Sequence, residues 1–459
     1  MNVTEELVNN IVETRLENLS REVIERAKEE VMDVIGCAVG GANATGCPMI
    51  LDLVREWGGS EEATILAHGV KAPAHNVALA NAVMARSFDY GIVDMYYEGE
   101  IRPAHIGETL VPTALAIAEQ KAISGKELLT ALITGEDLVS RVMAASNPKI
   151  RWDLTSTGNT LGATAVAGKL WGIDKGQLLN AFGIALNQIG GTSQNLNERV
   201  HCFKLGQGLA AQRGIFSVRL AAKGFTGVKD PLTGDLGYFA LFSPDYRPEI
   251  LTRQLGQKYY LEVTFKPYPS CRATHGAIDG TLEILHKDRI KVEDIDEVTV
   301  IVQNTSYPPV IRQPFIISKV PHVDAIFSLQ YTVACALLRG GVKPEHFTEE
   351  SIREPRIAEI IKKVKVASQD FPNEPSLATT VQMKLKDGRN FSAHISVPKG
   401  NELQNPMTRD EKRDKFRGNL SFSKKVSAEN GEKALRLLED LEEVQDIRKI
   451  VKLLVATRN

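Results

Sequence analysis

The chain has 459 residues, which is long enough for more than one hydrophobic core. Its 43% hydrophobic and 24% charged residues and formal net charge of −2 are those of a globular protein, and give no reason to expect nucleic acid or a membrane as partner. The N-terminus lacks an apolar signal-peptide core and no run is long enough to span a bilayer, so we expect a cytoplasmic protein.

Residues 1–262 carry a helical pattern almost throughout. Apolar residues recur at spacings of three and four in segments 21–39, 75–88, 109–123, 126–144, 159–172, 176–190 and 207–224. Small residues are abundant in these segments, which lets neighbouring helices approach closely. The pattern predicts a large bundle of mostly buried helices.

The period changes after about residue 258. Segments 260–265, 297–303, 380–385 and 390–397 read as strands, with a hairpin turn at 386–389, and helical patterns at 271–286, 322–339 and 352–366 alternate with them. Helical periodicity returns in 408–417, 424–439 and 442–456. We therefore predict a mainly α protein: a large helical domain made of 1–262 and 401–459, with a smaller α+β lid domain inserted at 263–400.

The most informative stretch is the corner at 265–281, Phe-Lys-Pro-Tyr-Pro-Ser-Cys-Arg-Ala-Thr-His-Gly-Ala-Ile-Asp-Gly-Thr. Its two prolines end a strand and stiffen the turn before a helix. The corner carries Lys266, Cys271, Arg272 and His275, a set of side chains that suits an anionic ligand beside a helix N-terminus. Taken singly, each residue also fits a structured turn with a core cysteine and a capping histidine.

A second polar cluster lies at 86–109, where a helix ends near Asp89 and an irregular loop is expected before the next helix near Glu108. Loops between rigid elements often carry catalytic groups. Asp89, Asp94 and His105 are candidates to hold or protonate a small acid here. The same residues also fit a polar loop with ordinary helix-end side chains.

Three isolated positions complete the set of candidates. Asp153 precedes a helix rich in small residues and fits either an N-cap or a substrate contact. Lys204 is a candidate carboxylate anchor, although a lone lysine is more often solvated. Tyr331 sits in an otherwise apolar helix and also fits a core tyrosine with a satisfied hydroxyl.

Cofactor and metal signatures are missing from the sequence. The five cysteines are scattered without a Cys-x-x-Cys pair, and the sequence has no G-x-G-x-x-G, H-E-x-x-H or G-x-S-x-G motif. The cofactor-binding, zinc-protease and hydrolase interpretations therefore lose their best evidence.

Together these segments resemble the MmgE/PrpD family over essentially the whole chain. The specific match is the Lys-Pro-Tyr-Pro-x-Cys-Arg-x-Thr-His corner. Supporting matches are the 89–105 loop, Thr-Leu-Gly-Ala-Thr-Ala at 160–165, the segments at 208–214 and 223–227, and Ser-Leu-Gln-Tyr at 328–331. The resemblance implies a homodimer with a cofactor-free site between the two domains, and it implies site residues Asp89, His105, Lys266, Cys271 and Tyr331.

The chain departs from the family pattern in its site. The first loop is longer than usual and contains Asp94, and Phe203 with Lys204 displaces a usual lysine by one position. Asp153 and Cys271 stand where decarboxylase members of the family have histidines.

The chemistry that the resemblance implies is proton transfer at a carbon next to a carboxylate, which requires preorganised cations to stabilise an enolate-like charge. We expect His105 to be the acid–base group, because its ordinary pKa of about 6.5 lies near neutrality. Lys266 and Arg272 would hold carboxylates, with Asp89 and Tyr331 as positioning or partner groups, and Cys271 as pocket wall or second base.

Three functions remain open at this stage. The first is a cofactor-free lyase, a dehydratase or decarboxylase of a small di- or tricarboxylate. The second is an epimerase or isomerase of a similar acid, and the third is an inactive carboxylate-binding homologue.

Overall fold

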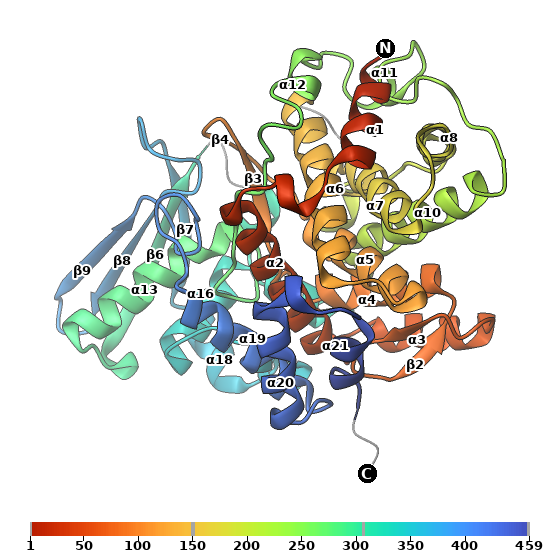
Figure 1. The fold of residues 1–459 in the computed structure, drawn as a ribbon. Coiled ribbons are helices and arrows are strands. Elements are labelled where there is room, and N and C mark those ends of the chain that lie inside the picture. The colour runs from red at the N-terminus through yellow and green to blue at the C-terminus, as the bar shows by residue number, and fades with distance from the viewer. Residues whose placement is uncertain (1, 148–151, 305–307, 457–459) are drawn as a thin grey trace.

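The structure, a computed structural model, describes residues 2–147, 152–304 and 308–456. The protein is mainly α, and Figure 1 shows a helical body beside a smaller region that contains a four-stranded sheet. The longer helices of the first part of the chain are α1 (Val3–Glu13), α2 (Arg21–Gly40), α3 (Cys47–Trp57), α4 (Ala74–Arg86), α5 (Gly107–Lys121), α6 (Gly125–Ala145), α7 (Leu154–Trp171), α8 (Lys175–Leu186) and α10 (Leu205–Ala221).

The centre of the helical body is built from α4, α5, α6, α7 and α10, which pack on one another. Small residues make this close packing possible, as the sequence predicts. A Cβ atom added at Gly214 on α10 would lie 2.6 Å from the Cβ of Ala163 on α7. Any larger residue at Gly214 would therefore push these two helices apart.

The α+β region contains the sheet β7-β6-β8-β9, formed by β6 (Ile295–Gln303), β7 (Val364–Gln369), β8 (Thr379–Leu385) and β9 (Asn390–Ile395). β6 pairs in parallel with β7 and antiparallel with β8, which forms a hairpin with β9. Helix α13 (His275–Asp288) packs on β8 and β9, and α16 (Leu329–Arg339) packs on α13 and β7.

The C-terminal helices α19 (Arg409–Ser423), α20 (Ala428–Glu439) and α21 (Arg448–Leu453) return to the helical body, where α19 and α20 pack on α2 (Figure 1). A buried ion pair joins α2 in the N-terminal part of the chain to α19 in the C-terminal part, since Lys415 Nζ lies 2.6 Å from Asp33 Oδ1. The same ammonium donates a hydrogen bond of 2.6 Å to the carbonyl oxygen of Tyr90. The boundaries proposed at 262 and 400 remain predictions.

The 90–106 segment is more regular than predicted. The structure has β3 (Val93–Tyr97) and β4 (Glu100–Arg102) in place of an irregular loop, and β5 (Val263–Thr264) completes the sheet β4-β3-β5. Two short strands, β1 (Ala63–Ile65) and β2 (Val70–Ala72), form another hairpin. All five residues of β3 are buried, so the strand lacks the polar–apolar alternation that identifies a half-exposed strand.

Three helical predictions were wrong in their extent. The segment predicted at 322–339 is divided into α15 (Pro321–Ile326) and α16 by a break at 327–328. The segment at 352–366 begins at the last residue of α17 (Glu349–Ile352), contains α18 (Pro355–Ile361), and ends in β7. In 442–456 only α21 is α-helical. Among the described residues, no helix combines the length and apolarity needed to cross a membrane.

Candidate active site

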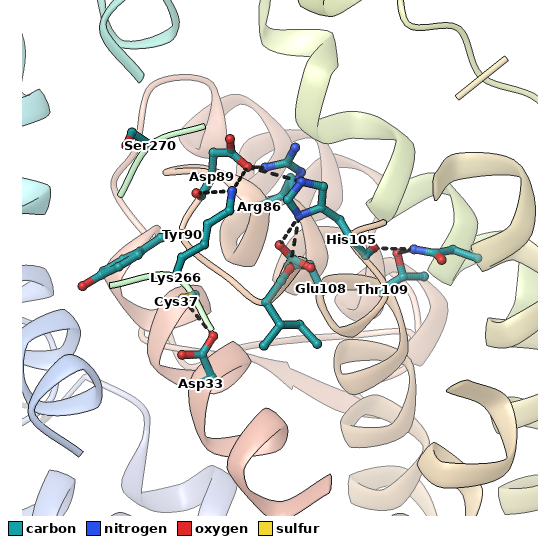
Figure 2. Close-up of polar contacts among 12 residues, drawn as sticks. Asp33, Cys37, Arg86, Asp89, Tyr90, His105, Glu108, Thr109, Lys266 and Ser270 are labelled. Atoms are coloured by element: carbon teal, nitrogen blue, oxygen red, sulfur yellow. Dashed lines mark hydrogen bonds and ion pairs between the residues drawn. The ribbon is translucent and has the colours of Figure 1, made fainter. Parts of the chain in front are cut away.

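Asp89 is the centre of a buried polar cluster between α4 and the 265–281 corner (Figure 2). Its Oδ1 atom accepts a hydrogen bond from Arg86 and another of 2.7 Å from Lys266 Nζ, which also donates to the Asp89 carbonyl at 2.8 Å. The Nε2 atom of His105 lies 3.5 Å from the same carboxylate oxygen. Burial opposes ionisation of Asp89, but the charges of Arg86, Lys266 and His105 outweigh it and hold the pKa well below its usual range.

The backbone around Asp89 is constrained. Asp89 itself has a φ of +47°, in the left-handed region that non-glycine residues seldom adopt. Two residues on, a Cβ atom at Gly91 would lie 2.6 Å from Glu108 Oε1, so only glycine lets the loop pass this side chain. The loop is therefore held in one conformation that delivers the Asp89 carboxylate to the two cations.

His105 is oriented by a buried carboxylate. Its Nδ1 atom lies 3.2 Å from Glu108 Oε1 and 3.2 Å from the carbonyl oxygen of Ile92, both of which can only accept a hydrogen bond. Glu108 is fully buried in the first turn of α5, and His105 is the main cause that lowers its pKa against the cost of burial. The ring proton therefore belongs on Nδ1, and Nε2 is left as the basic atom that faces Asp89.

The backbone of His105 is also held in place. Asn159 on α7 donates hydrogen bonds of 2.7 Å to the His105 carbonyl and of 2.9 Å to Thr109 Oγ1. These bonds connect the histidine to two helices of the body. The side chain keeps 15% of its surface accessible, while the Asp89 side chain is only 2% exposed. The imidazole is thus the member of the cluster that a small molecule can reach.

The corner at 265–281 places its cations differently from one another. Lys266 is fully buried on the Asp89 cluster, and burial lowers its pKa. The guanidinium of Arg272 instead donates to the carbonyl oxygens of Lys399, at 2.5 Å, and Pro398, at 2.8 Å. His275 is buried with Nδ1 3.2 Å from Arg272 Nη1 and Nε2 3.3 Å from the Ser270 carbonyl. Arg272 and His275 therefore connect the corner to the segment before the C-terminal helices.

Asp94 lies on a β-bulge of β3. The pairing with β5 shifts between Val93, opposite Thr264, and Met95, opposite Val263, so Asp94 is the extra residue. It has a φ of +62° and is 8% exposed. Burial raises the pKa of its carboxyl, although Arg272, Lys266 and His105 act in the opposite direction.

Asp153 and Cys271 lie near the cluster and are both partly exposed. Asp153 is the N-cap of α7, with a bond of 3.0 Å from the Thr155 amide and one of 2.7 Å from Ser156 Oγ, and its charge acts on Arg86. Burial and the neighbouring Asp89 raise the pKa of Cys271 to about 11. Cys271 is therefore a neutral thiol near pH 7, which suits pocket wall better than a base.

Lys204 and Tyr331 also lack a contact with Asp89 or His105 among the described residues. Lys204 is buried behind the loop, where its Nζ atom donates to the Thr45 carbonyl at 2.5 Å and to Ser87 Oγ at 3.1 Å. Tyr331 is buried in the α+β region and donates its hydroxyl hydrogen to the carbonyl of His346. Their functional roles remain predictions.

Sequence reasoning missed Arg86 and the orienting role of Glu108. Arg86 belongs to the last turn of α4, where its charge reads as an ordinary helix-end residue. In the structure it is buried, stacks over the Phe203 ring at 5.4 Å and pairs with Asp89. Within the described residues its buried Nε atom has no hydrogen-bond acceptor, so this donor is unsatisfied. The spacing of Glu108 three residues after His105 was the available signal.

A cavity of about 1620 Å³ lies between α13, the 340–345 turn and α19. Tyr90 and Pro267 line it, while Asp89, His105 and Lys266 do not. Across residues 2–147, 152–304 and 308–456, no three His, Cys, Asp or Glu side chains gather in a way that could hold a metal ion.

Comparison with known families accounts for both parts of the chain. Residues 5–251 match the MmgE/PrpD N-terminal domain, and residues 268–443 match the MmgE/PrpD C-terminal domain. The chain belongs to the MmgE/PrpD family. Lys266 lies between the two matched segments, and its ammonium contacts Asp89 in the first of them.

Relatives within the MmgE/PrpD family extend over nearly the whole chain. The cis-aconitate decarboxylase of Homo sapiens is 24% identical over 468 residues, covering 98% of this chain and 94% of that protein. The Mus musculus cis-aconitate decarboxylase is 25% identical over 470 residues, and that of Aspergillus terreus is 24% identical over 489 residues; both alignments cover 98% of this chain, with 93% and 96% of those proteins. These similarities support an enzyme of the MmgE/PrpD type.

Proposed function

We propose that this protein is a lyase that removes water or carbon dioxide from a small di- or tricarboxylate by proton transfer next to a carboxylate. The observation that carries the proposal is the arrangement of His105. Its Nδ1 atom faces buried Glu108, and its Nε2 atom faces the Asp89 carboxylate, which pairs with Arg86 and Lys266. A partly exposed histidine with one nitrogen fixed by a carboxylate is suited to general acid–base catalysis.

The cations next to His105 match the needs of this reaction. Removing a proton from a carbon next to a carboxylate produces an enolate-like charge, which buried donors stabilise more strongly than water does. The unsatisfied Nε atom of Arg86 and the ammonium of Lys266 would bind the substrate carboxylate. Asp89 keeps both cations in position, because their mutual repulsion would otherwise separate them.

The epimerase alternative needs a second base on the opposite face of the substrate. Cys271 is the sequence's candidate for that base, and its raised pKa of about 11 leaves too little thiolate at neutral pH. We therefore rank the lyase first. A homodimer with this site in each subunit is part of the same proposal, and light scattering of the purified protein would test it.

Proton NMR in D₂O tests the proposed reaction directly. The protein is incubated with 2-methylcitrate, citrate, cis-aconitate, tartrate and iminodisuccinate, each separately. Loss of water or carbon dioxide from one of these acids supports the lyase. Deuterium uptake next to a carboxylate without elimination would favour the epimerase, and binding without any change would favour an inactive carboxylate-binding protein.

A further inference from the structure

The backbone at Asp94 is strained and irregular. The β-bulge between Val93 and Met95 leaves Asp94 without a ladder partner, and its φ of +62° lies in a region that costs a non-glycine residue about 1 kcal/mol or more. A bulge re-aims a side chain relative to its strand, and bulges are common next to active sites. A polar loop without a function would need neither the bulge nor the buried carboxyl.

Asp94 lies among charged groups of the proposed site. The charged groups that act on it are Arg272, Lys266 and His105, and the hydroxyl of Thr264 on β5 hydrogen-bonds to its carboxyl. Burial and the charge of Asp94 raise the pKa of Tyr96, whose hydroxyl oxygen lies 2.8 Å from Thr264 Oγ1. Lys266 and His105 therefore act on both Asp94 and Asp89, and each of these two aspartates has a positive φ.

The two carboxyl groups differ in what they can do. Asp89 is ion-paired to Arg86 and Lys266 and is held ionised. Asp94 has no comparable ion pair among the described residues, and its burial favours the protonated acid. Two carboxyls whose surroundings separate their protonation in this way are a recurrent arrangement for acid and base roles in one site.

We propose that Asp94 is a catalytic acid that donates a proton to the hydroxyl group leaving the substrate. This inference rests on the proposed lyase function and selects, within it, elimination of water from a hydroxy-polycarboxylate. His105 Nε2 takes the proton from the carbon next to the carboxylate, and the C–H electron pair becomes the new C=C bond. The C–O bond breaks with its electrons on oxygen, and the proton of Asp94 completes the departing water.

The two proton transfers of this reaction are made by different residues, so the roles of Asp94 and His105 can be tested separately. Proton removal from carbon needs the imidazole alone, while departure of hydroxide needs an acid because hydroxide is a poor leaving group. Fluoride leaves without full protonation. A substrate analogue in which fluorine replaces the hydroxyl should therefore depend on His105 but much less on Asp94.

The test compares Asp94→Asn and Asp94→Glu with the wild type on citrate, 2-methylcitrate and tartrate, and on the analogues that carry fluorine in place of the leaving hydroxyl. Asp94→Asn should lower the rate of water loss by about 100-fold or more, which is a typical contribution of general acid catalysis. Fluoride release should fall by less than about 10-fold, and deuterium uptake at carbon should persist. Asp94→Glu, which restores an acid, should recover part of the rate of water loss.

A matched control on the same hairpin is Glu100→Gln, because Glu100 is exposed and bonds only to Arg102 and Arg247 in the described part of the chain. The Glu100→Gln variant should eliminate water from the substrate at the wild-type rate. Thermal melting curves of each variant establish that it is folded.

Three results would overturn the role of Asp94 and leave the lyase intact: wild-type water loss in Asp94→Asn, an equal fall in water and fluoride release, or a wild type that only decarboxylates. A wild type that eliminates nothing from the hydroxy acids, their fluoro analogues or cis-aconitate would overturn the lyase itself.

Discussion

Glu108 holds His105 in a defined orientation: the Oε1 atom of Glu108 lies 3.2 Å from Nδ1 of His105, three residues away in the chain. The carboxylate is fully buried at the start of α5, so its charge acts on the imidazole with little screening by water. The pair determines which ring nitrogen carries the proton, and thereby which nitrogen can accept one from a substrate.

Glu108→Gln should lower kcat by about 10-fold or more with little change in KM, because a neutral amide supports the imidazole less well. Loss of the negative charge also disfavours protonation of the imidazole, which acts as the base, so the acidic limb of the kcat/KM profile should move to lower pH. Steady-state kinetics between pH 5 and 9 measure both effects. An unchanged pH profile would mean that Glu108 only fills space.

His105→Ala should lower turnover by about 100-fold or more, since general acid–base groups typically contribute this much. The matched control is His286→Ala, which removes another histidine from the last turn of α13, in the α+β region. Turnover assays with the substrate identified by NMR measure both variants. Wild-type turnover in His105→Ala would exclude the histidine from the reaction.

Lys266→Ala should mainly raise KM, by about 10-fold or more, because it removes a buried cation that would bind the substrate carboxylate. Asp89 keeps Arg86 as a partner in this variant, so the loop should stay folded. Lys287→Ala, an exposed lysine on α13, is the control. If both kinetic constants of Lys266→Ala equal those of the wild type, the lysine lies outside the site.

Tyr331→Phe tests a prediction made from the sequence against the position seen in the structure. The hydroxyl of Tyr331 is bonded to the His346 carbonyl inside the α+β region, and loss of such a bond costs about 1 kcal/mol of stability. We expect a small drop in melting temperature and a kcat within about threefold of wild type. A 100-fold loss of kcat without destabilisation would restore Tyr331 to the catalytic residues.

Glu136 predicts a pH dependence of stability. It hydrogen-bonds to Glu30 in the core between α2 and α6, and burial raises its pKa to about 7. Because the pKa of this carboxyl is higher in the folded protein than in the unfolded chain, its contribution to folding stability is full below the unfolded pKa of about 4.3. The contribution is lost as pH rises through the folded pKa of about 7. The melting temperature should therefore fall between pH 5 and pH 8. In Glu136→Gln the fall should be smaller, and an identical fall in both proteins would contradict this account.

The sequence predicted the elements with strong periodicity and the residues whose chemistry is distinctive. Helices α2, α4, α5, α6, α7 and α10 were found because their apolar residues recur at helical spacing, and the α+β region was found from its change of period. Strand β3 was missed because it is buried throughout, and β7 because its first residues continue a helical pattern.

Partners in space were harder to predict than residue types. Lys266 and Arg272 are equivalent cations in the corner motif, yet one faces Asp89 and the other binds backbone carbonyls. Arg86 was missed because nothing in a helix-end arginine indicates that its side chain turns inward. The contacts of Lys266 and Arg272 join segments more than 100 residues apart, which local patterns do not encode.

The ammonium of Lys415 has a consequence for how activity arises during synthesis. It is buried, pairs with Asp33 and holds the carbonyl of Tyr90, the residue next to Asp89. A nascent chain therefore cannot complete this support until residue 415 has left the ribosome, when more than 300 residues already separate it from the loop that it stabilises. Activity should appear late in translation, and a fragment ending before α19 should be inactive even if its helices have formed.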